Sequence, residues 1–252
     1  MSFATDGALA GARIAVTGAN RGIGRALADA FASAGARLVL HAREPAAAAA
    51  VADALGAKAP GRAIAVAGDL RDPELGARLA DAALGAFGGL DALVLNAGQL
   101  GPMQPLADTD FAAFRAVMEV NVDAQARLFV ATLPLLRESR GKVIWEGRGS
   151  GRVIWMTSGL GHFALPGYGV YCVSKHAVEG LAKLAHADHG GDGIVSVAVA
   201  PGMVRTEMLT AATRGDVPDS AVDVEVAGAR FVRLLAGLGP DDGGKILDLT
   251  NF

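Results

Sequence analysis

Cysteine is nearly absent from this chain, which has one cysteine, Cys172, among 252 residues. A single thiol excludes an internal disulfide and cannot supply the cluster of sulfur ligands of a zinc or iron–sulfur site. We see no other metal-ligand cluster in the sequence and expect no metal. Residues 1–11 also lack the basic and apolar regions of a signal peptide, so we expect a cytoplasmic protein.

The chain is also poor in charge of one sign and in long apolar runs. Lys and Arg total 23 and Asp and Glu total 26, mixed along the chain, for a net charge of -3. This balance gives no basic stripe for nucleic acid. No apolar run approaches the roughly 20 residues that cross a bilayer, so we expect no membrane partner. Hydrophobic residues make up 52% of the chain but aromatic residues only 5%, which predicts a sizeable, mainly aliphatic core.

Short apolar segments alternate with amphipathic segments along the whole chain. The apolar segments predict buried strands at 13–16, 37–40, 63–67, 91–95, 153–156, 194–199 and 245–249. The segments between them predict helices at 23–34, about 46–55, near 74–86, from the cap at 108–110 through Phe111, Phe114 and Met118, at 173–184 and at 224–235. Strands that alternate with helices predict an α/β fold with a Rossmann-type, doubly wound parallel sheet. No linker interrupts the pattern, so residues 1–252 form a single predicted domain.

One short sequence occurs twice. Residues 141–145 (GKVIW) are repeated ten residues later as 151–155 (GRVIW). Only one copy can occupy the strand position, and the second copy leads directly into Thr157 and Ser158. We interpret the repeat as a local duplication that extrudes 142–150 as a surface insert. The alternative is that residues 146–149 build a binding loop.

A glycine-rich turn follows the first predicted strand and opens the first predicted helix. Its sequence runs from Thr17 to Gly24, TGANRGIG. Glycines allow backbone N–H groups to approach a pyrophosphate, and the helix N-terminus adds partial positive charge. In this context the turn predicts dinucleotide binding rather than a merely tight turn. The residues assigned to it are Gly18, Asn20, Arg21, Gly22 and Ile23.

The residues after the second strand discriminate between NADP(H) and NAD(H). A carboxylate at this position binds the ribose 2′-hydroxyl of NAD and repels a 2′-phosphate. This chain instead has His41, Ala42 and Arg43. Arg43, reinforced by Arg21, can bind the phosphate through paired N–H donors, which favours NADP(H). The alternative is that both are solvated surface arginines.

Two further segments at strand ends are candidate cofactor contacts. Asp69 and Leu70 follow the third strand, where a carboxylate can accept a hydrogen bond from the adenine amino group. Asn96, Ala97 and Gly98 follow the fourth strand. The small residues leave room for the adenine-side ribose, and we expect Asn96 to hold neighbouring backbone.

Tyr171 and Lys175 are four residues apart, which places a phenol and an ammonium on one helical face. A free tyrosine has a pKa near 10, and a nearby cation favours the phenolate. We expect Lys175, helped by the positive ring of the oxidised cofactor, to lower the pKa of Tyr171 so that it can act as an acid and base. Ser158, at the end of a predicted strand, can hydrogen-bond a substrate oxygen as charge develops on it.

Taken together and in order, these motifs resemble the short-chain dehydrogenase/reductase family, in its common single-domain branch. The resemblance extends from Leu9 to about Leu249. The matching positions are Thr17, Gly18, Gly22, Ile23, Gly24, Asp69, Asn96, Ala97, Gly98, Asn121, Ser158, Tyr171, Lys175, Pro201 and Gly202. The family resemblance implies a Rossmann fold and hydride transfer between a nicotinamide and a carbonyl carbon.

The resemblance also implies roles for single residues. Tyr171 resembles the family's proton donor and acceptor, Ser158 its substrate-oxygen ligand, and Lys175 the residue that tunes the tyrosine and binds ribose. Asn121 resembles the asparagine that holds a water in the proton relay. The segment 201–206 resembles the one that contacts the nicotinamide amide and the phosphates, which assigns Pro201, Gly202, Val204 and Thr206 to the cofactor. The family also implies a homodimer or a homotetramer.

His162 and Tyr168 lie between Ser158 and Tyr171 and are candidate substrate contacts. Phe163 and Leu165 nearby suggest a mainly apolar pocket. We therefore expect an NADP(H)-dependent carbonyl reductase or alcohol dehydrogenase for a small to medium substrate. The alternative function is a catalytically silent regulator or scaffold that binds the cofactor with the same fold.

Overall fold

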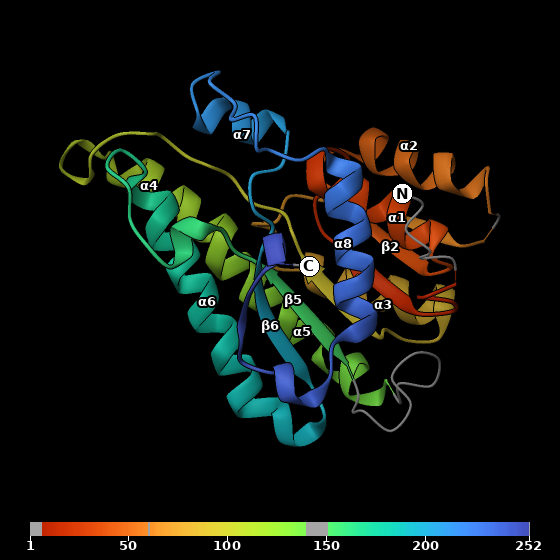
Figure 1. The fold of residues 1–252 in the computed structure, drawn as a ribbon. Coiled ribbons are helices and arrows are strands. Elements are labelled where there is room, and N and C mark those ends of the chain that lie inside the picture. Colours follow the sequence, from red (N-terminus) through yellow and green to blue (C-terminus); the bar gives the residue numbers. More distant parts are fainter. Residues whose placement is uncertain (1–6, 60, 140–150, 252) are drawn as a thin grey trace.

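The computed structural model of the chain describes residues 7–59, 61–139 and 151–251. Within these ranges, seven parallel strands form one sheet in the order β3-β2-β1-β4-β5-β6-β7 (Figure 1). The strands are β1 (Arg13–Val16), β2 (Arg37–Ala42), β3 (Ala63–Ala67), β4 (Ala92–Leu95), β5 (Arg152–Met156), β6 (Val195–Ala200) and β7 (Ile246–Asp248). The helices are α1 (Gly22–Ser33), α2 (Pro45–Gly56), α3 (Leu75–Phe87), α4 (Phe111–Met118), α5 (Ala124–Glu138), α6 (Gly169–His189), α7 (Glu207–Ala212) and α8 (Val224–Gly237). The predicted single-domain, doubly wound α/β fold is confirmed.

The strand order reverses between β1 and β4. The chain runs outward from β1 through β2 to β3, and then returns to place β4 on the other side of β1. The loops that leave β1 and β4 therefore diverge at the carboxyl edge of the sheet. In parallel sheets, ligands bind in the crevice at this switch point.

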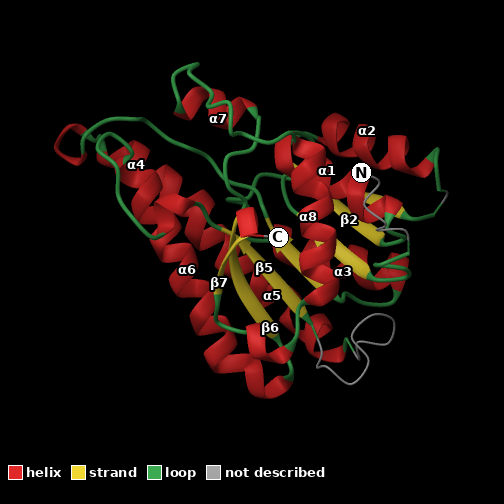
Figure 2. Cartoon of the chain, in the orientation of Figure 1, coloured by secondary structure: helices red, strands yellow, loops and turns green. Residues whose placement is uncertain are grey.

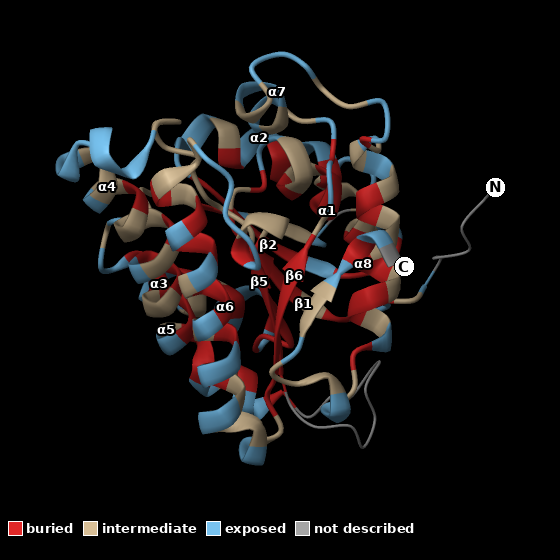
Figure 3. Cartoon of the chain, turned by 60° about the vertical axis from the view of Figure 1, so that its left-hand side comes forward, coloured by how far each residue is buried: buried red, intermediate tan, exposed pale blue. Residues whose placement is uncertain are grey.

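Helices cover both faces of the sheet, as the ribbon shows (Figure 2). Alternate strand residues point to opposite faces, so Ile14 and Val16 of β1 pack with α1, α2 and α8, whereas Ala15 packs with α3, α5 and α6. The five inner strands are almost entirely buried, the edge strands β3 and β7 are partly exposed, and the exposed residues lie mainly on the outer sides of the helices and in the loops (Figure 3). Strands buried on both faces explain why they are continuous apolar runs in the sequence.

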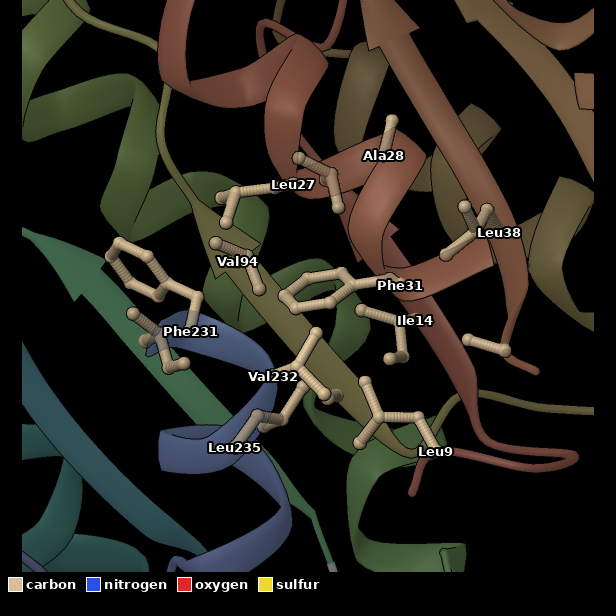
Figure 4. Close-up of a cluster of buried hydrophobic side chains, with 14 of the residues drawn as sticks. Leu9, Ile14, Leu27, Ala28, Phe31, Leu38, Val94, Phe231, Val232 and Leu235 are labelled. Carbon is tan, nitrogen blue, oxygen red and sulfur yellow. The ribbon is translucent and has the colours of Figure 1, made fainter. Parts of the chain in front are cut away.

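The core between α1 and α8 is tightly packed. Phe31 of α1 and Phe231 of α8 enter the same cluster as Val94 of β4 (Figure 4) and are fully buried. Burial of each phenyl ring contributes about 1.5–3 kcal/mol. A Cβ atom at Gly228 would lie 3.0 Å from Ala26 O, so the glycine lets the two helices approach closely. This packing fixes α1, whose N-terminus faces the predicted cofactor site.

The helix predicted after Asp110 is longer than expected. As predicted, Asp110 caps α4, and its carboxylate accepts hydrogen bonds from Ala112 N and Ala113 N. The chain then remains helical through a π-helical turn, η2 (Glu119–Asp123), and through α5 to Glu138. The prediction missed α5, which contains Pro134 in its interior. A proline lacks the backbone N–H that a helix interior normally uses, so it obscures the helical pattern.

The second copy of the repeated sequence forms β5, as predicted. It lies between β4 and β6, and the indole nitrogen of Trp155 donates to Ser196 Oγ at 2.9 Å. The first copy and the predicted insert at 142–150 lie outside the described residues.

The short helix α7, which the sequence did not predict, follows β6 at the carboxyl edge of the sheet. None of the helices in the described ranges is long and apolar enough to cross a membrane.

Candidate active site

The predicted site residues gather along one edge of the sheet because each follows the carboxyl end of a strand. Gly18 follows β1, Arg43 follows β2, Asp69 follows β3, Asn96 follows β4 and Ser158 follows β5. Parallel strands end on the same side, so the topology alone brings these distant segments together.

The glycine loop has no room for side chains where the backbone turns. Gly18 and Gly22 have φ angles of +66° and +53°, a region that favours glycine. A Cβ atom at Gly24 would overlap Gly18 O and lie 2.6 Å from Asn96 Nδ2. α1 begins without a side-chain cap at Arg21, so the N–H groups of its first turn can bind an anion. A narrow, uncapped helix start fits the pyrophosphate of a dinucleotide.

Asn96 holds the backbone of this loop, as predicted. Its Nδ2 donates to Thr17 O at 2.9 Å. In return, Thr17 Oγ1 accepts hydrogen bonds from Asn96 N and Ala97 N, both at 3.0 Å. These bonds join the ends of β1 and β4 across the switch point, so the two walls of the crevice are held at a fixed separation.

His41 is a site residue that sequence reasoning missed. It is buried, and its Nε2 lies 2.9 Å from Gly68 O while its Nδ1 faces Gly18 N at 3.4 Å. A carbonyl only accepts, so Nε2 carries the proton and Nδ1 accepts from Gly18. Burial lowers the pKa of His41, which favours this neutral form. The imidazole thus holds the backbone of the glycine loop at Gly18. The position of His41 at the end of the second strand, two residues before Arg43, could have indicated from the sequence that it lies at the site.

The charged residues around the predicted nucleotide site are exposed or partly exposed, and each is paired with a residue of opposite charge. Arg21 Nη1 lies 2.6 Å from Glu207 Oε2 of α7, and Arg43 Nε lies 3.1 Å from Glu44 Oε1. Asp69 forms two side-chain hydrogen bonds with the guanidinium of Arg71, which hold the pKa of its carboxyl well below the usual range. Arg21, Arg43 and Asp69 therefore lie at the predicted nucleotide site, and each forms an ion pair with another residue of the chain.

Ser158, Tyr171 and Lys175 come together where β5 ends against α6. The Ser158 hydroxyl lies close enough to the Tyr171 phenol to lower its pKa as a hydrogen-bond partner. Lys175 Nζ lies 5.5 Å from the centre of the Tyr171 ring and donates to Met156 O at 2.7 Å. The side chain of Lys175 is almost completely buried, with 5% of the residue exposed. The three side chains therefore share one centre, as their spacing predicted.

The protonation of this centre differs from the expectation. Burial raises the pKa of Tyr171 to about 12, although the hydrogen bond with Ser158 acts in the opposite direction. Burial also lowers the pKa of Lys175 to about 8. Lys175 was expected to lower the pKa of Tyr171, together with the oxidised cofactor, but among the chain's own groups desolvation has the largest effect on this pKa, and Lys175 is not one of the groups that shift it. The protein by itself keeps the phenol protonated.

Asn121 lies in the π-helical turn η2 and is 1% exposed. Its Oδ1 accepts from Gln99 N at 2.8 Å, and its Nδ2 donates to Gln99 O at 2.9 Å and to Ser174 Oγ at 3.0 Å. Ser174 in turn donates to Tyr171 O at 2.8 Å. The side chain of Asn121 therefore joins the loop after β4 to the helix turn that carries Tyr171. The predicted water-binding role stays a prediction.

The remaining predicted contacts surround the centre. Tyr168 OH donates to Ala212 O of α7 at 2.7 Å, and Thr206 Oγ1 caps the same helix by accepting from Leu209 N at 3.2 Å. His162 Nδ1 lies 2.7 Å from Glu179 Oε1. Glu179 is a second buried residue that sequence reasoning missed. It is four residues after Lys175, and this spacing could have indicated that both side chains lie on the same face of the helix.

Comparison with known proteins places these features in a family. The family model for short chain dehydrogenases matches residues 12–216. A short-chain type dehydrogenase/reductase from Picea abies is 35% identical over 232 residues, covering 89% of this chain and 81% of that protein. An NADPH-dependent aldehyde reductase-like protein, chloroplastic, from Arabidopsis thaliana is 33% identical, covering 94% of this chain and 90% of that protein.

A solved structure shows the same arrangement. A short chain dehydrogenase from Shigella flexneri complexed with NADP superposes with a TM-score of 0.82 at 28% identity, over 95% of this chain and 97% of that chain. The fold, the sequence match and the match to this structure agree along nearly the whole chain. The chain belongs to the short-chain dehydrogenase/reductase family and is an oxidoreductase of that family.

Proposed function

We propose that the protein is an NADP(H)-dependent oxidoreductase that interconverts an aldehyde or ketone and an alcohol. The observation that carries the proposal is the centre formed by Ser158, Tyr171 and Lys175 at the crevice edge of this fold. A phenol held protonated beside a hydroxyl suits proton transfer to a carbonyl oxygen. The substrate would be small to medium and mainly apolar.

The glycine loop and the start of α1 fit the pyrophosphate of the cofactor. The residues that would hold the nucleotide are Gly18, Asn20, Arg21, Gly22, Ile23, Arg43, Asp69, Leu70, Asn96, Ala97, Gly98, Pro201, Gly202, Val204 and Thr206, with Tyr171 and Lys175 at its nicotinamide end. When bound, NADPH supplies the hydride that reduces the carbonyl carbon.

Each residue of the centre has a proposed role in reduction. Ser158 donates a hydrogen bond to the substrate oxygen as negative charge develops on it. The O–H bond of Tyr171 breaks and a new O–H bond forms on the substrate, which leaves an alcohol. Lys175, protonated below its pKa of about 8, stabilises the resulting phenolate. Asn121 keeps the helix turn of Tyr171 in register with the loop after β4. Oxidation of the alcohol reverses these steps.

The preference for NADP(H) is proposed from the arginines at the rim. Ala42 ends β2 where a carboxylate would repel a 2′-phosphate, and Arg43 follows it. Arg43 and Arg21 are exposed by about three-quarters, so either can exchange its acidic partner for a phosphate. The NADP complex of the S. flexneri relative supports the same cofactor.

The proposed substrate polarity follows from side chains near the centre. Phe163, Leu165, Met203 and Met208 are each 39–53% exposed. They belong to the two segments that flank the predicted substrate side, after β5 and after β6. We also propose a homodimer or homotetramer, as the family resemblance implies, and a cytoplasmic location.

A panel of aldehydes, ketones and alcohols tests the proposal when it is run with both cofactors. Turnover is followed by the absorbance of the reduced nicotinamide. We expect reduction of apolar carbonyls with NADPH and a lower kcat/KM with NADH. Tight NADPH binding without turnover of any member would instead indicate the silent regulator or scaffold, and a preference for NADH would refute the cofactor assignment.

A further inference from the structure

We propose that Glu179 is a positioning residue that fixes the loop of Ser158 against the helix of Tyr171 and Lys175. The inference rests on the proposed function, because it concerns the geometry of that same centre. Glu179 lies on α6, one helical turn after Lys175, and is 5% exposed.

The carboxylate of Glu179 contacts the chain on both sides of Ser158. Its Oε1 accepts a hydrogen bond from Thr157 Oγ1 at 3.0 Å. The same oxygen lies 2.7 Å from His162 Nδ1, which donates to it. Thr157 directly precedes Ser158, and His162 ends the 3-10 turn Gly159–Gly161 that follows it. One carboxylate thus holds the start and the end of the loop.

The loop backbone is shaped around this carboxylate. A Cβ atom at Gly161 would overlap Glu179 Oε1, so any larger residue would displace the carboxylate from this position. Burying a carboxylate is costly unless donors satisfy it. The neighbouring core positions of α6 are apolar: Val178, Ala182 and Ala185. An apolar residue could complete the packing at 179, but it could not bind Thr157 and His162.

A second set of bonds joins the same two elements one turn earlier. Lys175 Nζ donates to Met156 O at 2.7 Å, and Thr157 Oγ1 also lies 3.4 Å from Lys175 O. Glu179 and Lys175 therefore attach the end of β5 to consecutive turns of α6. Since Ser158 lies just after β5 and Tyr171 is on α6, these bonds determine how far apart the two hydroxyls lie.

The test compares Glu179→Leu, Glu179→Gln and Thr157→Val with the wild type on a carbonyl substrate. A displacement of about 1 Å in a reacting group can lower a rate by about 100-fold, so we expect Glu179→Leu to lower kcat by about 10–100-fold. Glu179→Gln keeps an oxygen acceptor for Thr157 and should rescue most of the activity. Thr157→Val keeps the shape of the side chain but removes the hydroxyl, and should lower kcat in the same direction.

A further readout separates positioning from general damage to the structure. The dissociation constant for NADPH, measured by fluorescence without turnover, should be unchanged in all three variants. The double variant Thr157→Val/Glu179→Leu should lose little more activity than Glu179→Leu, because the Thr157–Glu179 bond that Thr157→Val removes is already lost in Glu179→Leu. Asp188→Asn, which alters an exposed carboxylate of the same helix, is the matched control and should behave as wild type.

The outcomes that overturn the inference are distinct. Unchanged kcat in Glu179→Leu and Thr157→Val would show that the bonds do not position Ser158. If Glu179→Leu does not fold, Thr157→Val decides the matter, and wild-type kcat in that variant refutes the inference. A loss of kcat matched by an equal loss of NADPH affinity and a lower Tm would refute it in favour of a purely structural role. If the wild type itself reduces no carbonyl, the proposed function fails and the inference fails with it.

Discussion

The nucleotide end and the chemical end of the crevice differ in how far their charged side chains are exposed to solvent. At the nucleotide end, Arg21 and Arg43 are 75% and 72% exposed, and each pairs with an equally exposed glutamate. At the chemical end, Lys175 is 5% exposed and binds a backbone carbonyl. Exposed ion pairs contribute about 0–1 kcal/mol and are screened by salt. Burial of a charge is costly and shifts its pKa.

This difference indicates what each end can do. Exposed arginines can change partners at little cost, which suits recognition of a ligand that arrives and leaves. The partly buried phenol and the buried ammonium have shifted pKa values and fixed neighbours, which suits proton transfer at one defined place. We therefore expect substitutions at the chemical end to have large effects on kcat, and substitutions at the nucleotide end to have smaller effects on cofactor binding.

The largest effect is expected for Tyr171→Phe. The substitution removes the proposed proton donor but keeps the ring that packs beside Lys175. We expect kcat to fall by about 1,000-fold or more, since positioned acid–base groups contribute about 10²–10⁴-fold. The dissociation constant for NADPH, measured by fluorescence, should remain close to that of the wild type. Turnover within tenfold of the wild type would remove Tyr171 from its assigned role.

Lys175→Met should abolish most turnover and stabilise the protein. The folded pKa of Lys175, about 8, is below its unfolded value of 10.5. Below pH 8 both states are protonated, so the folded state bears the full cost of the buried charge. We expect the free energy of unfolding at pH 7 to rise by about 1–3 kcal/mol, measured by urea denaturation.

The pH dependence of this difference has a definite sign. Between pH 8 and 10.5 the unfolded wild type keeps the proton that the folded state has lost, so wild-type stability rises with pH relative to the variant. The advantage of Lys175→Met should therefore shrink over this window. Lys183→Met, at an exposed position of the same helix, is the control and should show no such gain. Equal stability of wild type and Lys175→Met at pH 7 would contradict the cost of burial.

A moderate effect is expected for Arg43→Ala. Hydrogen bonds to charged groups contribute about 1.5–3 kcal/mol, so kcat/KM for NADPH should fall by about 10–100-fold. The value for NADH should stay unchanged, because NADH lacks the 2′-phosphate. An equal fall with both cofactors would mean that Arg43 does not recognise the phosphate.

The smallest effect is expected for Glu207→Gln. The substitution breaks the exposed pair with Arg21 and frees the guanidinium for the nucleotide. NADPH affinity should rise by about two- to fivefold at low salt, and the gain should vanish at high salt. Glu225→Gln on α8 removes another exposed carboxylate and should leave the affinity unchanged. A salt-independent gain would argue for a change in α7 rather than in the ion pair.

The sequence predicted the fold and the outline of the site because both depend on local patterns. Apolar runs located the seven strands that the structure describes, and the glycine loop and the Tyr171–Lys175 spacing are each contained within a few residues. The missed features depend on tertiary packing. Pro134 interrupts the local pattern of α5, and the roles of His41 and Glu179 arise from contacts with Gly18, Gly68, Thr157 and His162. Such contacts are set by how helices and loops pack on the sheet, which spacing alone does not encode.

The most direct measurement is the titration of Tyr171 itself. The chain has two tyrosines, so Tyr168→Phe leaves Tyr171 as the only one. Tyrosinate absorbance is followed against pH with and without NADP⁺. We predict a pKa of about 12 for the free protein and a lower value with NADP⁺, whose positive ring favours the phenolate. An ordinary pKa near 10 that NADP⁺ leaves unchanged would contradict a desolvated phenol at the reacting centre.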